Sequence, residues 1–253
     1  WLNRPAPRNS SSAKMPIGRC DDMEYLIGTL ILAAIWGALF VFRRDLRHVM
    51  IWSSSAALLF LSVGFIVIRL LLPDLPVEMT IVPGYWDPDT LFNFGRITGG
   101  FAIEDALFMF FTGGISGVIY EEISRRHLSR RRVRHVPHLA LAAGAVSGFA
   151  STKLELNLVY GLIIACFVGA FVIWIQRHDL IKHSFLGGLA FFAIYSIAFL
   201  IFLLLFPDYI QQYYSIHNIS GVLLIGLPLE ELLFAFGFGL LWSPIYEYVK
   251  DLR

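Results

Sequence analysis

Apolar residues are gathered along the chain into seven blocks that short polar segments separate. Most of the blocks hold roughly 18–25 residues, the length that an α-helix needs to cross a bilayer. The pattern predicts an all-α integral membrane protein with about seven transmembrane helices, at residues 25–42, 49–72, 101–120, 138–152, 158–175, 185–206 and 221–248. The fourth is the shortest and is rich in small residues, which suit close packing between helices.

Composition agrees with this prediction. Hydrophobic residues make up 57% of the 253 residues and charged residues only 15%, against about 45–50% and about 25% in soluble domains. Residues 1–23 are polar and rich in Pro, Ser and Arg, so we expect a disordered or non-native N-terminal extension. Cys20 and Cys166 lie in different settings and favour two isolated thiols over a disulfide or a metal site.

Short motifs recur in the two halves. RRDL (43–46) resembles RHDL (177–180), and IEDALFMFFTGG (103–114) resembles LEELLFAFGFGL (229–240). Each half holds three spans and the fourth span joins them. Because the joining helix is a single span, both halves have the same orientation, so the pattern predicts two parallel three-helix repeats with a ligand site between them.

Basic residues indicate how the spans cross the membrane. They cluster at 43–48, 125–135 and 176–183, and at the C-terminal KDLR. Seven spans place all four clusters on one side, which the positive-inside rule identifies as the cytoplasm. We therefore expect the N-terminus outside and the C-terminus in the cytoplasm, in the plasma membrane.

Two pairs of acids stand at the start of apolar spans. Glu104 and Asp105 open the third span, while Glu230 and Glu231, just after Pro228, open the last. Charged residues in spans are costly and usually functional. Acids at a helix start also interact favourably with the helix dipole, which is a purely structural use. Two pairs at equivalent places in the repeat favour a shared function.

A phenylalanine accompanies each pair. Phe108 follows Glu104 by four residues, and Phe234 follows Glu230 by four. Residues four apart share a helix face, so the spacing predicts that Glu104 and Glu230 lie on one stripe with these rings and that the second acid points elsewhere.

Apolar surroundings suit a particular chemistry for these acids. Burial favours the protonated form of a carboxyl group, which can then act as an acid, and an ionised partner can act as a base. Aromatic faces stabilise cations. No nucleophile or metal set accompanies the acids. The combination favours proton-initiated carbocation chemistry on an alkene over hydrolysis.

Two further features are weaker candidates. A second matched set stands at the cytoplasmic ends of the third and last spans, where we expect its carboxylates to be solvated beside the basic loops; its members are Tyr120, Glu121, Tyr246 and Glu247. The outer loop 82–101 is rich in aromatic residues, Pro and Gly, and includes Tyr85 and Trp86. It is either an interfacial aromatic belt or a lid over an apolar site.

Three stretches together resemble the lycopene cyclases of the small membrane type, with both halves in one chain. They are PGYWDPDTLFNF (83–94), GFAIEDALF with GVIYE (100–121) and GLPLEELLF with IYEYVKD (226–251). The P-x-E-E pattern of the last stretch is the most telling. The first half departs from it, because Asp105 replaces the second Glu and no Pro stands two residues before Glu104.

The resemblance implies a lycopene β-cyclase of carotenoid biosynthesis. Residues 24–122 would form the first cyclase repeat, 123–157 the basic loop and joining helix, and 158–253 the second repeat. The substrate would be lycopene or γ-carotene in the bilayer, with other carotenoid-pathway enzymes as partners and no nucleic acid. Catalysis would fall to Glu104, Asp105, Glu230 and Glu231, with substrate or cation contacts from Phe108, Phe234, Tyr85, Trp86 and Pro228.

No G-x-G-x-x-G fingerprint follows a predicted strand, so we expect no flavin and no other cofactor or metal. Relatives that form ε- or γ-rings on C50 carotenoids, or that hydrate the ψ-end, begin with the same protonation and stay open as alternatives. Outside enzymes the alternative is a seven-helix transporter, because paired intramembrane acids also serve proton coupling.

Overall fold

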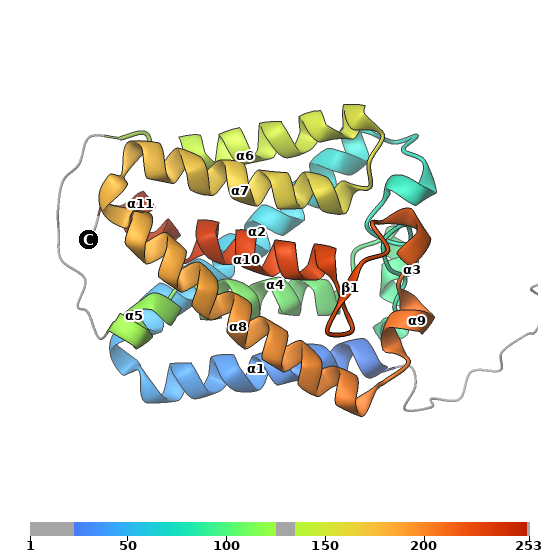
Figure 1. Cartoon of the computed structure of the whole chain (residues 1–253), viewed down its shortest axis with the longest axis horizontal. Coiled ribbons are helices and arrows are strands. Elements are labelled where there is room, and N and C mark those ends of the chain that lie inside the picture. The colour runs from blue at the N-terminus through green and yellow to red at the C-terminus, as the bar shows by residue number, and fades with distance from the viewer. Residues whose placement is uncertain (1–22, 125–134, 252–253) are drawn as a thin grey trace, which may run out of the picture.

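The computed structural model describes residues 23–124 and 135–251 and is built almost entirely of helices (Figure 1). The helices are α1 Glu24–Phe42, α2 Arg47–Leu71, α3 Phe94–Thr98, α4 Ile103–Ser116, α5 Ile119–Ser124, α6 Leu139–Ala150, α7 Leu158–Gln176, α8 Ile181–Leu205, α9 Tyr209–Tyr213, α10 Leu229–Trp242 and α11 Ile245–Lys250. The two short strands are β1 Leu223–Leu224 and β2 Leu227–Pro228. The predicted N-terminal extension, with Cys20, and most of the second basic cluster lie outside the described residues.

Six helices of the described part are long and apolar enough to cross a membrane. They are Glu24–Phe42, Arg44–Leu71, Ile103–Ile123, Leu158–Gln176, His178–Leu205 and Leu229–Lys250. The fourth predicted span is also helical, but the apolar helix there, Leu139–Leu154, is shorter than these six. The expected all-α membrane architecture is therefore present, with six long spans and one short apolar helix.

The last predicted span begins too early. Residues 221–228 form a hairpin in which Leu223 pairs with Pro228, and the helix begins only at Leu229. Gly221 and Gly226 have φ of 72° and 82°, values that favour glycine and interrupt a helix. Pro228 then precedes the first helical turn, where its missing N–H costs nothing. Hydropathy alone did not separate this apolar hairpin from the helix that follows it.

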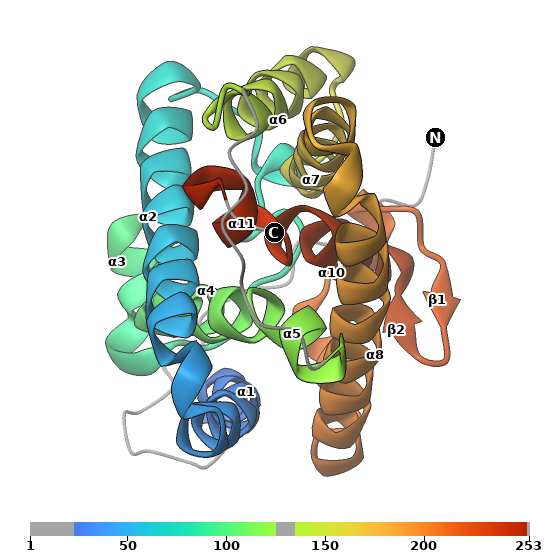
Figure 2. The same ribbon diagram turned by 90° about the vertical axis from the view of Figure 1, so that its left-hand side faces the viewer.

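Helices α4 and α10 lie at the centre of the bundle, surrounded by α1, α2, α6, α7 and α8 (Figure 2). The central spans are 61% and 72% buried, against 11–44% for the other four. Glycines permit the close approach of α4 to its neighbours: a Cβ atom on Gly113 would lie 2.4 Å from the Cβ of Ala57 and 2.9 Å from the carbonyl oxygen of Ser53. The two acid-bearing helices are thus the inner elements of the fold.

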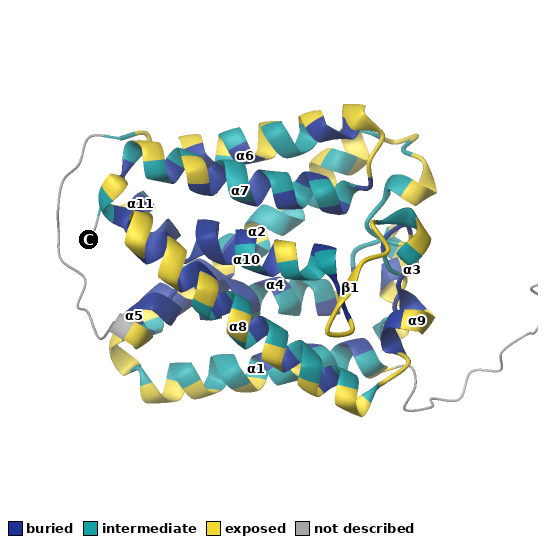
Figure 3. Cartoon of the chain, viewed as in Figure 1, coloured by how far each residue is buried: buried dark blue, intermediate teal, exposed yellow. Residues whose placement is uncertain are grey.

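The outward faces of the peripheral helices carry exposed apolar side chains, as the exposed positions on α1 and α8 illustrate (Figure 3). Leu59, Phe171 and Leu204 are 64%, 58% and 81% exposed. Such faces suit lipid, because lipid tails are as apolar as the side chains themselves.

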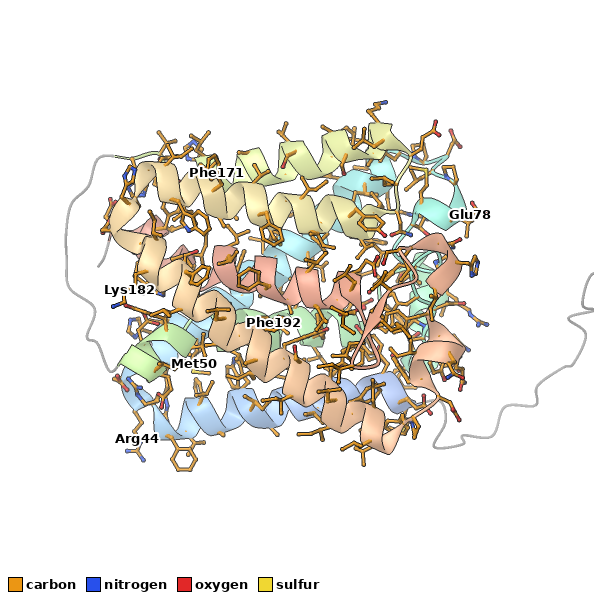
Figure 4. All side chains as sticks on the ribbon, in the orientation of Figure 1. Arg44, Met50, Glu78, Phe171, Lys182 and Phe192 are labelled. Atoms are coloured by element: carbon orange, nitrogen blue, oxygen red, sulfur yellow. The ribbon has the colours of Figure 1, made fainter. Side chains whose placement is uncertain are left out.

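The same local contact closes the turn after the first long helix of each half. Arg43 donates to both carboxylate oxygens of Asp45 at 3.1 and 2.9 Å. Arg177 donates in the same way to Asp179 at 3.0 and 2.9 Å. Figure 4 labels Arg44 and Lys182, which neighbour these contacts, at one end of the bundle and Glu78 at the opposite end.

Candidate active site

A cavity of about 440 Å³ lies inside the bundle, toward the end that carries α3 and α9 (Figure 1). Pockets of about 300–1,000 Å³ commonly hold small apolar ligands. Helices of both halves contribute to the walls, together with the outer loop and α6, and most of the lining is apolar; it includes Leu32, Phe60, Phe65, Val82, Phe149, Leu162, Ala198, Phe199 and Phe202. The cavity is therefore a single apolar space shared by the two halves.

Two carboxyl groups line this cavity, and they are the second acids of the two pairs, Asp105 of α4 and Glu231 of α10. The hydroxyl of Tyr25 on α1 donates to Oδ1 of Asp105 at 2.5 Å. The backbone N–H of Ala102 donates to its Oδ2 at 2.7 Å. Asp105 therefore both caps the start of α4 and faces the cavity.

Glu231 lies in a cluster of three phenol groups. Tyr85 of the outer loop and Tyr214 after α9 donate to Oε1 at 3.0 and 2.8 Å. Tyr195 of α8 donates to Oε2 at 2.7 Å. Three O–H donors stabilise the ionised form of a carboxyl group. The arrangement thus places a carboxyl group that accepts three hydrogen bonds inside an otherwise apolar cavity.

The first acids of the pairs, Glu104 and Glu230, are each 1% exposed but do not line the cavity. The amide of Leu91 donates to Oε1 of Glu104 at 2.7 Å. The amide of Ser220 and the hydroxyl of Tyr160 donate to Oε1 of Glu230 at 2.9 and 2.7 Å. Both acids therefore hold the loop that precedes their helix.

This placement differs from the predicted stripe. Phe108 and Phe234 do line the cavity, but with Asp105 and Glu231, which precede them by three residues, rather than with the first acids. Residues three apart share a helix face as residues four apart do. The four-residue spacing was correct as a pattern, but it selected the wrong member of each pair.

The aromatic residues of the outer loop close the cavity at its end. Trp86 lines it and packs edge-on against Tyr25, with ring centroids 4.5 Å apart. The loop is tied to the segment after α9, because Asp87 donates its N–H to the carbonyl of Tyr213 and Ser215 donates to that of Tyr85, each at 2.9 Å. The sequence predicted either an interfacial aromatic belt or a lid over an apolar site, and these contacts fit the lid. Pro228 lies outside the lining and positions the start of α10.

The loop tyrosines stay neutral at ordinary pH. Burial raises the pKa of Tyr85 and Tyr214 well above the usual value, and the nearby Glu231 carboxylate raises both further. Burial likewise raises the pKa of Tyr209, and Glu231 and, more weakly, Asp105 add to the shift. These phenols therefore remain hydrogen-bond donors beside the acids.

The sequence did not single out Tyr25, Tyr195 or Tyr214. A signal existed in Tyr195, which stands within a predicted apolar span, since a buried phenol needs a hydrogen-bond partner. The partner itself was not readable, because Glu231 is 36 residues away from Tyr195 and 146 away from Tyr85.

The second matched set lies away from the cavity. Glu121 and Glu247 are 3% and 1% exposed, so the prediction that they are solvated is wrong: α5 and α11 turn them into the bundle rather than toward the basic loops. Tyr120 stacks on His183 with ring centroids 4.0 Å apart. Tyr246 packs edge-on against Trp52 at 5.3 Å.

A comparison with protein families finds one described as lycopene cyclase, whose model matches residues 23–123 and 157–249. The chain belongs to the lycopene cyclase family. Both acid pairs fall in these ranges, and so do the five tyrosines whose hydroxyls donate to Asp105, Glu230 or Glu231. No curated protein and no solved structure was found to match the chain.

Membership in this family makes the protein an enzyme of carotenoid cyclisation with a carotenoid substrate. Its long apolar helices indicate a multi-pass membrane protein. The match omits residues 124–156, which contain α6, so the helix between the two matched ranges is outside the family pattern.

Proposed function

We propose that the protein is a lycopene β-cyclase that closes the ψ-ends of lycopene to β-ionone rings, through γ-carotene to β-carotene. The observation that carries the proposal is that each half supplies one carboxyl group, Asp105 or Glu231, to a single apolar cavity. A redox-neutral, proton-initiated isomerisation requires an acid and a base in the same apolar cavity.

The hydrogen bonds suggest which acid has which role. Glu231 accepts three O–H bonds, which favour the anion, so we assign it as the base. Asp105 accepts two hydrogen bonds, and we assign it as the proton donor. Glu104 and Glu230, which hold the loops, act by positioning these neighbours.

The reaction is balanced without a co-reactant. The proton of Asp105 adds to the terminal double bond and forms a C–H bond, which leaves a tertiary cation. The internal double bond attacks this cation, forms the ring C–C bond and moves the positive charge into the ring. A ring proton then leaves to Glu231, and its C–H electron pair becomes the ring double bond. Exchange with solvent releases this proton from Glu231 and returns one to Asp105, which restores both groups for the next ring. No electron is gained or lost, so no redox cofactor is needed.

Aromatic faces would stabilise the cation between these steps. Phe108, Phe234 and Trp86 line the cavity beside the two acids. A cation over an aromatic face gains about 0.5–2 kcal/mol, most where water is excluded. These residues would therefore lower the energy of the intermediate without reacting with it.

We further propose that the fold consists of two parallel repeats, residues 24–122 and 158–253, joined by a segment that includes α6. The matching Arg43–Asp45 and Arg177–Asp179 contacts support this, as do the equivalent roles of the two acid pairs. The N-terminus would lie outside and the C-terminus in the cytoplasm of the plasma membrane, with other carotenoid-pathway enzymes as partners.

Expression in a bacterial host that accumulates lycopene tests the proposal. Chromatography of the extracted carotenoids should show γ-carotene and β-carotene for the wild type and unchanged lycopene for Asp105→Asn and Glu231→Gln. Glu122→Gln, whose carboxylate is at the far end and pairs with Arg43, is the matched control. Rings of ε type or a hydrated ψ-end would replace the β-cyclase assignment, and unchanged lycopene with well-expressed wild type would favour the transporter.

A further inference from the structure

Three side chains that the cyclase chemistry does not use converge at the end of the bundle opposite the cavity. They are Glu121 of α5, His183 of α8 and Glu247 of α11. One donor atom from each lies within 4.8 Å of the other two. All three side chains are at least nine-tenths buried, with exposures of 3%, 5% and 1%.

Three of the four carboxyl oxygens of this cluster lack a donor among the described residues. Both oxygens of Glu247 and Oε2 of Glu121 are buried without a hydrogen-bond donor among the described residues. One oxygen of each group lies within 4.8 Å of the other, and a proton shared between them would still leave other oxygens of the two groups unsatisfied. A buried carboxylate without a partner is costly. The cluster therefore calls for a positive charge placed between the two carboxylates.

Among the described residues, the two nearby arginines make hydrogen bonds elsewhere. Arg43 and Arg177 each make a bidentate contact with an aspartate of their own turn, Asp45 and Asp179. Glu121 and Glu247 remain as two buried carboxyl groups at the core of the cluster.

We propose that Glu121, His183 and Glu247 bind one divalent metal ion of the Zn²⁺ or Mn²⁺ class. Two carboxylate oxygens and an imidazole nitrogen suit such borderline cations. Ligand atoms at about 2.0–2.2 Å from a metal lie roughly 3–4 Å from each other, and Nε2 of His183 lies 3.5 Å from Oε1 of Glu121. The three ligands are more than 60 residues apart in sequence, so their spacing did not predict a metal site.

The metal would act on stability rather than on the cyclisation. Its ligands come from the last helices of both halves and from α8, so one ion would tie three helices together at this end. It is separate from Asp105 and Glu231, which line the cavity at the other end. Metal binding at this site can thus be measured without any carotenoid substrate.

Metal analysis of the untagged full chain, purified in detergent, tests this site directly. We expect about one Zn²⁺ or Mn²⁺ per chain, loss of the metal and a fall in the unfolding temperature on treatment with a chelator, and recovery on adding ZnCl₂ or MnCl₂. Wild-type protein that stays folded, carries no metal and shows no stabilisation by either salt would overturn the proposal in favour of a shared proton.

Variants provide the matched comparison. Glu247→Gln and His183→Ala should each abolish the metal content and the stabilisation by added metal. Glu122→Gln, the neighbouring carboxylate that is 39% exposed in its side chain, should leave both unchanged. Metal binding by a folded Glu247→Gln variant at the wild-type level would also overturn the site, whatever the cyclase assay shows.

Discussion

At the scale of single residues, the two acids of the cavity differ in their hydrogen bonds: Glu231 accepts three and Asp105 accepts two. Tyr85, Tyr195 and Tyr214 reach Glu231 from three separate segments. Hydrogen bonds to a charged group contribute about 1.5–3 kcal/mol each. The proposed base is therefore oriented by contacts that the rest of the fold must bring together.

Removing one phenol hydroxyl should disturb the orientation of Glu231, while the remaining ring keeps the shape of the cavity. We expect Tyr195→Phe and Tyr214→Phe each to slow ring formation about tenfold or more, since a lost bond of about 1.5 kcal/mol changes a rate by that factor. Initial rates of γ-carotene formation in membranes measure the effect. Tyr248→Phe, whose hydroxyl donates to the Val136 carbonyl, is the control, and unchanged rates in both cavity variants would argue against an oriented carboxylate.

The raised pKa of Tyr214 gives a pH prediction. A group whose pKa is higher in the folded state stabilises the fold below its unfolded pKa of about 10, and this contribution is lost as pH rises through the folded-state pKa. Ultraviolet absorbance of tyrosinate should show no difference between wild type and Tyr214→Phe until the protein unfolds at alkaline pH. A difference that titrates near pH 10 in folded protein would contradict the burial of this phenol.

At the scale of elements, α4 and α10 carry the acids, and their glycines let neighbouring helices pack closely against them. Sequence patterns located both helices and both acid pairs, since long apolar runs and charges within them are unambiguous. The hairpin at 221–228 and the choice of acid within each pair were not readable. The hairpin depends on backbone angles at Gly221 and Gly226. The choice of acid depends on the preceding loops, whose amides bind Glu104 and Glu230 and leave the second acid of each pair to face the cavity.

Filling one close contact should destabilise the bundle. In Gly113→Ala the added methyl group would meet Ala57 and the backbone of Ser53, and overpacking of this kind costs about 1–3 kcal/mol. Thermal unfolding in detergent should show a lower midpoint. Gly37→Ala, where no heavy atom lies within 4 Å of the added carbon, should unfold at or slightly above the wild-type temperature; equal losses in both would remove the packing explanation.

At the scale of the whole molecule, the two halves meet around one cavity and place their basic turns at the same end. The family and the membrane architecture were predictable from motifs and hydropathy. The tyrosine cluster and the buried carboxyl groups at the far end were not, because both depend on contacts between distant segments. The proposed orientation in the membrane rests on the basic turns.

Labelling from the two sides tests that orientation. In a background without Cys20, we expect Lys182→Cys to react with a membrane-impermeant maleimide only in inverted vesicles. Glu78→Cys, at the opposite end (Figure 4), should react in intact cells. The remaining Cys166 is buried and serves as the background in both samples. The reverse pattern would place the C-terminus outside and contradict the proposed topology.

The central claim, that Asp105 delivers a solvent-exchangeable proton to the ψ-end, is tested most directly by mass spectrometry of carotenoids formed in D₂O. Protein equilibrated in D₂O and held in excess over lycopene should yield one deuterium for each ring closed, and Asp105→Asn should yield neither ring nor label. Rings that form without deuterium, or labelling by Asp105→Asn at the wild-type rate, would contradict the account.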